Sequence, residues 1–94
     1  MVEARSQPLH FAAHFGYIFV AEHLARRGAE VTSAAIDGER PLHVAARWGH
    51  VFVAEHLGRR GAEASSATKD GWQPLHFAAP RGHVLIAEHL GRRR

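Results

Sequence analysis

The chain has 94 residues, which is enough for one small domain. It contains no cysteine, so disulfides, thiolate metal sites and cysteine nucleophiles are excluded together. Its formal net charge of +3 at pH 7 favours acidic partners only mildly.

A unit of 33 residues recurs in three copies along the chain. Pro-Leu-His recurs at 8–10, 41–43 and 74–76, and aligning residues 8–40 with 41–73 gives 21 identities in 33 positions. A fixed period of this length is the signature of a repeat protein, in which neighbouring units bury one another's apolar faces. The 17 alanines fit this interpretation, because small side chains let helices stack closely. We therefore expect an all-α repeat fold, an α-solenoid.

Each repeat predicts a short helix, a tight turn, a second helix and an extended loop. Proline suits the first position of a helix, and glycine can adopt the left-handed conformation that ends one. The first helices are therefore expected to begin at Pro8, Pro41 and Pro74 and to stop at Gly16, Gly49 and Gly82. The second helices are predicted at 17–26, 50–59 and 83–92. The stretches 29–40 and 62–73 have the turn chemistry of β-hairpin-like loops.

The motif Pro-Leu-His-x-Ala-Ala-x-x-Gly-His, with Gly-Ala-Glu and Asp-Gly before the next proline, resembles the ankyrin repeat over residues 7–94. The resemblance implies an L-shaped stack of helix-turn-helix units joined by β-hairpin-like loops. It gives one domain over 1–94, with repeats at about 5–36, 37–69 and a truncated 70–94. It also implies protein binding without a catalytic centre or cofactor.

Two departures from that family pattern recur in every repeat, and one falls in the third. The N-cap threonine is replaced by Gln7, Arg40 and Gln73, and a lost cap typically costs about 1 kcal/mol. The second leucine of helix two is replaced by Ala25, Gly58 and Gly91, which predicts a lighter core. Pro80 is expected to kink or shorten the third first helix, because it lacks an N–H.

Helix two also carries a large apolar residue where the family has glutamate, at Phe19, Phe52 and Leu85. If the helix keeps its usual rotation, these residues form an exposed stripe, which indicates a self-association surface. The alternative is that the helix is rotated, so that the stripe fills the space left by Ala25, Gly58 and Gly91.

Positions that differ between otherwise similar repeats fall at the ends of the first helices and at the loop tips, where ankyrin-like repeats contact partners. Tryptophan and arginine, which dominate interface hot spots, occur among them. The predicted partner-binding residues are His14, Phe15, Ile36, Asp37, Glu39, Arg47, Trp48, Lys69, Asp70, Trp72 and Arg81.

The sequence gives little support for a metal site or for an enzyme. The nine histidines occur mostly once per repeat, and packed helices are about 8–10 Å apart, too far for shared zinc ligands. Only His10 and His14 have chelating i,i+4 spacing, so we expect no metal site. No nucleophile is paired with a base, so we expect no enzyme.

An arginine edge at 26–27, 59–60 and 92–94 suggests nucleic-acid or acidic-ligand binding as a weaker hypothesis. Glu22, Glu55 and Glu88 precede these arginines by four residues, which favours a self-paired face instead.

Self-association through the stripe or through uncapped ends of the stack is the main alternative to partner binding. The close similarity of the repeats also leaves open an engineered scaffold, or a fragment, without a native partner. No apolar run reaches 18 residues and no signal peptide is present, so we expect an intracellular, cytoplasmic protein without membrane contact.

Overall fold

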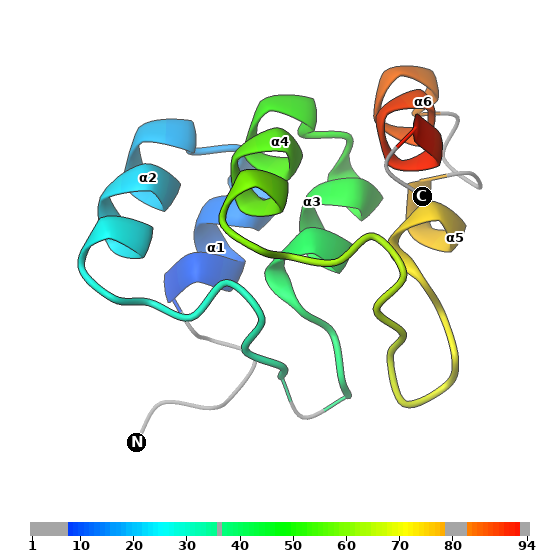
Figure 1. The fold of residues 1–94 in the computed structure, drawn as a ribbon, viewed down its shortest axis with the longest axis horizontal. Helices are drawn as coiled ribbons and strands as arrows, with labels where there is room; N and C mark the ends of the chain where they lie inside the picture. The colour runs from blue at the N-terminus through cyan, green and yellow to red at the C-terminus, as the bar shows by residue number, and fades with distance from the viewer. Residues whose placement is uncertain (1–7, 36, 79–82, 93–94) are drawn as a thin grey trace.

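The computed structural model describes residues 8–35, 37–78 and 83–92. Within them the chain forms six α-helices, which are α1 (Pro8–Phe15), α2 (Ile18–Arg26), α3 (Pro41–Trp48), α4 (Val51–Arg59), α5 (Pro74–Ala78) and α6 (Val84–Arg92). Figure 1 shows two layers, with the first helices α1, α3 and α5 in one and the second helices α2, α4 and α6 in the other. Neighbouring helices pack within each layer and between the layers. The predicted all-α repeat stack is confirmed.

The ends of the first helices largely follow the sequence. α1 and α3 stop before Gly16 and Gly49, whose φ angles of +73° and +74° are left-handed, as predicted. Gly82 and Pro80 lie outside the described residues, so the prediction for Pro80 is not tested. The second helices begin at Ile18, Val51 and Val84, one residue later than expected.

Histidine side chains cap two of the first helices. The Arg40 N–H donates to Nδ1 of His43 at 3.0 Å, and the Gln73 N–H donates to Nδ1 of His76 at 2.9 Å. Each bond is one half of a reciprocal capping box, in which the third helical residue binds the N-cap backbone. The prediction of uncapped helices is therefore corrected at α3 and α5, where histidine takes over part of the role of the missing hydroxyl.

A second set of histidines joins the repeats at the ends of α1 and α3. Nε2–H of His50 donates to the His14 carbonyl at 2.9 Å, and that of His83 donates to the Arg47 carbonyl at 3.0 Å. A Cβ added to Gly49 would lie 2.6 Å from Nδ1 of His83. Glycine is therefore needed for space as well as for its φ angle.

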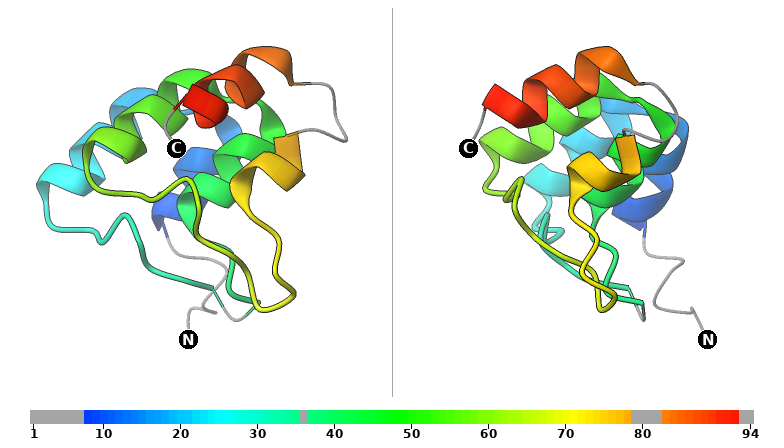
Figure 2. Two further views of the ribbon diagram at one scale, coloured as in Figure 1. Left: turned by 45° about the vertical axis from the view of Figure 1, so that its right-hand side comes forward. Right: turned by 90° about the vertical axis from the view of Figure 1, so that its right-hand side faces the viewer.

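The loops between repeats form the expected hairpin-like arms, which extend away from the helices (Figure 2). The Ala35 N–H donates to the Glu39 carbonyl at 2.8 Å, and the Thr68 N–H donates to the Trp72 carbonyl at 2.9 Å. Only turns and bends are present here, with no strand in the described part of the chain. The Lys69 N–H donates to the Asp37 carbonyl at 3.3 Å and so joins one arm to the next.

The core is built largely from alanine and medium-sized aliphatic residues. The buried alanines of the first helices are Ala12, Ala13, Ala45, Ala46 and Ala78, each at most 1% exposed. Leu57, Val53 and Ile86 fill the space behind them from the second helices. This arrangement explains the alanine content, because the backbones of neighbouring first helices must approach one another closely.

The apolar stripe of the second helices faces outward. Phe19 is 80% exposed, Phe52 is 71% exposed and Leu85 is 68% exposed. The interpretation in which the helices rotate to bury these side chains is therefore wrong. The adjacent Val53 and Ile86 already occupy the inward position on the second helices.

Candidate functional site

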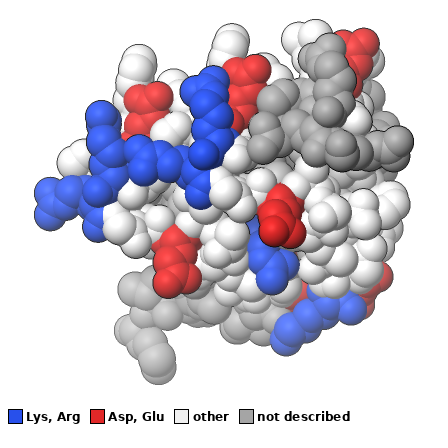
Figure 3. All heavy atoms as spheres, in the orientation of Figure 1, with Lys and Arg blue, Asp and Glu red and all other residues white. Residues whose placement is uncertain are grey.

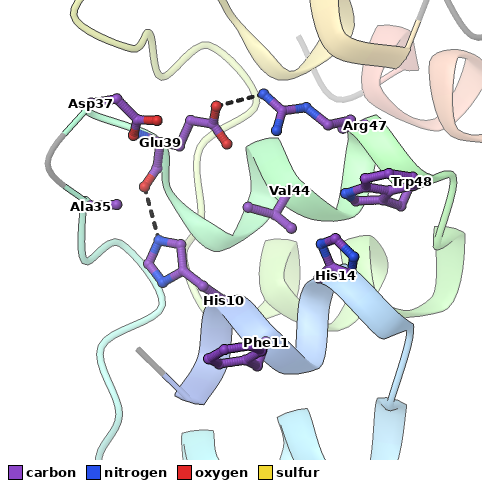
Figure 4. Close-up of a pocket in the computed structure, with 9 residues that line it drawn as sticks. All are labelled: His10, Phe11, His14, Ala35, Asp37, Glu39, Val44, Arg47 and Trp48. Atoms are coloured by element: carbon purple, nitrogen blue, oxygen red, sulfur yellow. Dashed lines mark hydrogen bonds and ion pairs between the residues drawn. The ribbon is translucent and has the colours of Figure 1, made fainter. Parts of the chain in front are cut away.

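The first helices and the loop arms together enclose a hollow between repeats one and two. It has a volume of about 210 Å³, and its walls are His10, Phe11, His14, Ala35, Asp37, Glu39, Val44, Arg47 and Trp48. Figure 4 shows the two carboxylates at one end and the rings of Trp48 and His14 at the other, with Val44 between them. The hollow therefore combines an acidic end with an aromatic end.

A second hollow lies beside the first, between repeats two and three. Its volume is about 230 Å³, and its walls are Asp37, Glu39, Arg47, Thr68, Asp70, Trp72 and Phe77. Asp37, Glu39 and Arg47 line both hollows and so form a shared wall. The two hollows are thus neighbouring parts of one continuous surface on the side of the loop arms.

The shared wall is held in place by bonds from several elements. Nη2 of Arg47 donates to Oε2 of Glu39 at 2.5 Å, and its guanidinium lies 4.6 Å from the centre of the Phe77 ring. The Glu39 carbonyl accepts Nε2–H of His10 at 2.9 Å, while the Glu39 N–H donates to Oδ1 of Asp37 at 3.0 Å. The acidic groups are therefore positioned before any partner arrives.

Aromatic rings continue from each hollow onto the surrounding surface. The centre of the His14 ring lies 4.6 Å from that of Trp48 and 4.4 Å from that of Phe15. The Phe15 ring in turn stacks on the Tyr17 ring, with 5.5 Å between their centres. Trp72 contacts Phe77 at 5.5 Å beside the second hollow. Both tryptophans keep large exposed fractions, 39% for Trp48 and 45% for Trp72. Such half-exposed aromatic side chains are typical anchors of protein interfaces.

His43 supports this surface from below as a neutral side chain. Because Nδ1 accepts the Arg40 N–H, Nε2 carries the proton and donates to the Ser66 carbonyl at 2.9 Å. Burial lowers the pKa of His43 below its usual 6.5 and so favours the neutral form that these two bonds require. The pKa of His56, between the second helices, is also lowered, first by burial and then by nearby arginines.

Most of the predicted partner-binding residues come together on this surface. His14, Asp37, Glu39, Arg47 and Trp48 line the first hollow, and Asp70 and Trp72 complete the second. Phe15 stands next to the first hollow, and Lys69 lies beside Asp37 through its backbone bond. Ile36 and Arg81 lie outside the described residues.

Sequence reasoning missed several lining residues. Phe11, Val44 and Phe77 occupy one repeat position that varies along the chain, so the variability that identified the other residues was a usable signal. His10 has the same identity in every repeat, and only its bond to Glu39 reveals its contribution. Thr68 and Ala35 also vary between the two loops.

The arginine edge lies elsewhere on the molecule. Figure 3 shows basic side chains gathered over the C-terminal ends of α2 and α4, where Arg26, Arg27, Arg59 and Arg60 are exposed. Arg59 approaches Glu55 at 3.7 Å in the predicted i,i+4 pairing. Residues 93–94 lie outside the described part of the chain.

The described residues contain no group of three histidine, aspartate or glutamate side chains arranged to hold a metal ion. The same residues include no helix with the length and apolar character needed to cross a membrane.

Comparison with protein families finds that a model for ankyrin repeats, in three copies, matches residues 9–92. The match covers nearly all of the range over which the repeat motifs occur. A comparison with curated proteins finds no match.

Proposed function

Since the chain belongs to the ankyrin-repeat family, whose members generally mediate protein–protein contacts and are typically non-catalytic, we propose that it is a binding scaffold that recognises a protein partner through the two hollows. The partner contacts the loop tips and the exposed side chains of α1, α3 and α5. A partner lying across the shared wall would contact three repeats at once.

The observation that carries this proposal is the convergence of exposed aromatic and charged side chains on one preformed surface. Trp48 and Trp72 belong to different hollows but share the Arg47–Glu39 wall. The wall is fixed by hydrogen bonds within the chain, so its side chains lose little conformational freedom when a partner binds. Large half-exposed rings around a fixed polar centre are the arrangement of an interface hot spot.

The test is selection of random linear peptides displayed against the intact chain, followed by affinity measurements with Trp48→Ala, Trp72→Ala and the double variant. We expect the double variant to weaken binding by more than about 2 kcal/mol, or roughly 30-fold. Phe52→Ala removes an even more exposed aromatic ring from the layer of the second helices and is the matched control. Binding that is unaffected by both tryptophan substitutions would place recognition elsewhere.

A second candidate function is self-association through Phe19, Phe52 and Leu85. Their exposure of 68–80% favours it, because a row of large apolar side chains in water usually marks a contact surface. Sedimentation velocity over a hundredfold concentration range should then show dimers or larger species, and Phe52→Glu should return the chain to monomers. A wild-type chain that stays monomeric throughout would contradict this candidate.

Binding of nucleic acid or another acidic ligand remains the weaker hypothesis. The pairing of Arg59 with Glu55 reduces the positive charge available on the arginine edge. Micromolar affinity for a generic DNA duplex with a steep dependence on salt would reverse this ranking.

A further inference from the structure

The two ends of the first hollow differ in chemistry. Asp37 and Glu39 contribute carboxylates at one end, while Trp48 and His14 contribute rings at the other (Figure 4). Val44 lies between these two ends in Figure 4, and Phe11 lines the hollow from α1. A side chain that enters this space meets apolar surface along its length and negative charge at one end.

The charges around the hollow leave an excess of negative charge. Two carboxylates, of Asp37 and Glu39, and one guanidinium, of Arg47, line it, which gives a formal sum of −1. Arg47 is paired with Glu39, whereas Asp37 forms no ion pair within the described residues and is exposed at the loop tip. The Asp37 carboxylate therefore remains available to a cation from outside.

The second hollow already shows how this surface holds a cation. There the guanidinium of Arg47 lies over the Phe77 ring at 4.6 Å and donates to the Glu39 carboxylate. An aromatic face and a carboxylate together match the two recognition modes of a guanidinium, stacking and charge-assisted hydrogen bonding. In the first hollow His14 occupies the repeat position that corresponds to Arg47, and Val44 stands where the second hollow has Phe77, so α1 contributes no guanidinium to it.

We propose that the first hollow binds an arginine side chain of the protein partner, a step that rests on the proposed function. The methylene stem lies along Val44 and Phe11, and the guanidinium pairs with Asp37. Arginine is favoured over lysine because a planar guanidinium can present two N–H donors to a carboxylate, whereas the lysine ammonium is a point charge. It is favoured over leucine because an apolar side chain would leave the carboxylate partly desolvated without a partner.

The test uses the peptides selected against the intact chain and four measured affinities. The best arginine-containing peptide and its copy with citrulline, a neutral isostere of arginine, are each measured with wild type and with Asp37→Asn. We expect a loss of about tenfold from either change alone and almost no further loss when both are made, since both remove the same ion pair. The Asp37→Asn variant retains a side-chain oxygen for the Glu39 N–H, so the loop tip should keep its shape, and circular dichroism and thermal melting check this.

Asp70→Asn is the matched control variant, because Asp70 occupies the corresponding repeat position but lines the second hollow. It should not change the loss caused by citrulline. If the selected peptides depend on Trp48 and Trp72 but share no arginine, or if Asp37→Asn leaves the arginine peptide unaffected, the arginine pocket is refuted while the binding scaffold stands. Absence of any tryptophan-dependent peptide would refute the scaffold itself, and the pocket with it.

Discussion

The interface between repeats one and two and the interface between repeats two and three use the same framework but are filled differently. Val31, after α2, is 9% exposed and belongs to the core, whereas its counterpart after α4 is the smaller Ala64. Leu42 in α3 is 3% exposed, while Leu75 at the same position in α5 is 37% exposed. A cavity of about 580 Å³ opens where Gly58, Ala64, Leu75 and Leu90 meet. The first interface is closed and the second is open.

This difference separates the requirements of packing from those of recognition. The two hollows of the candidate binding surface have similar volumes, about 210 and 230 Å³, although the apolar interfaces behind them differ. Their shape is set by loop hydrogen bonds and by the Arg47–Glu39 pair, which do not depend on Val31 or Ala64. Changes in the core of either interface should therefore alter stability more than recognition.

The largest expected contrast is between truncations of the two equivalent leucines. Leu42→Ala should destabilise the fold by about 3 kcal/mol, because it removes a buried side chain from a packed site. Leu75→Ala should cost about 1 kcal/mol, since that side chain is already partly in water and borders a cavity. Guanidinium chloride unfolding of both variants measures the difference. Equal losses would show that the two interfaces are equally packed in solution.

A second comparison should show the two interfaces behaving alike. Gly16→Ala and Gly49→Ala each combine a left-handed φ with a Cβ 2.5 or 2.6 Å from a histidine ring, and we expect each to cost about 2–3 kcal/mol. Gly61→Ala has a left-handed φ of +106° but meets no atom within 4 Å, so it should cost only about 1 kcal/mol. Thermal melting of the three variants tests this. A Gly61→Ala variant as unstable as Gly49→Ala would remove any role for His83.

The opposite experiment closes the second interface. Ala64→Val gives that loop the residue of its counterpart and should stabilise the fold by about 1 kcal/mol by filling part of the cavity. The reverse change, Val31→Ala, should destabilise the closed interface by about 1–2 kcal/mol and is the matched control. Denaturant midpoints give both values. If Ala64→Val destabilises the chain, the side chain does not reach the open space.

The repeat architecture was predictable because its signals are local. Proline at helix starts, glycine at Gly16 and Gly49, and the 33-residue period depend only on neighbouring residues and on identity between repeats. The same reasoning selected both tryptophans and the charged groups of the shared wall, which the structure brings together around the two hollows. The exposure of Phe52 was one of two alternatives that the sequence left open, and the structure selects it.

What could not be predicted depends on contacts between repeats. The bond from Nε2 of His50 to the His14 carbonyl and the capping role of His43 require positions in space that no spacing in the sequence specifies. The stacking of Arg47 on Phe77 joins α3 to α5 and is equally non-local. The open second interface likewise results from the combined effect of Gly58 and Ala64, whose neighbours lie on other helices.

The smallest expected effect is acid destabilisation, which should act at both interfaces. Burial lowers the pKa of His43 and that of His56 below the usual 6.5. His43 donates to the Ser66 carbonyl in the second loop, and His56 lies on α4. The unfolded chain therefore binds protons more readily than the folded chain, so stability is complete above about pH 6.5 and falls as the pH drops below it. Each histidine should contribute a loss of less than about 1 kcal/mol between pH 8 and pH 6.

Denaturant unfolding at pH 8, 7 and 6 measures this loss of stability. His56→Leu should make the dependence of stability on pH shallower while leaving the His43 contribution. A wild-type chain with the same stability at pH 8 and pH 6 would mean that neither ring is kept neutral by the fold, and Nδ1 of a protonated His43 could not accept the Arg40 N–H.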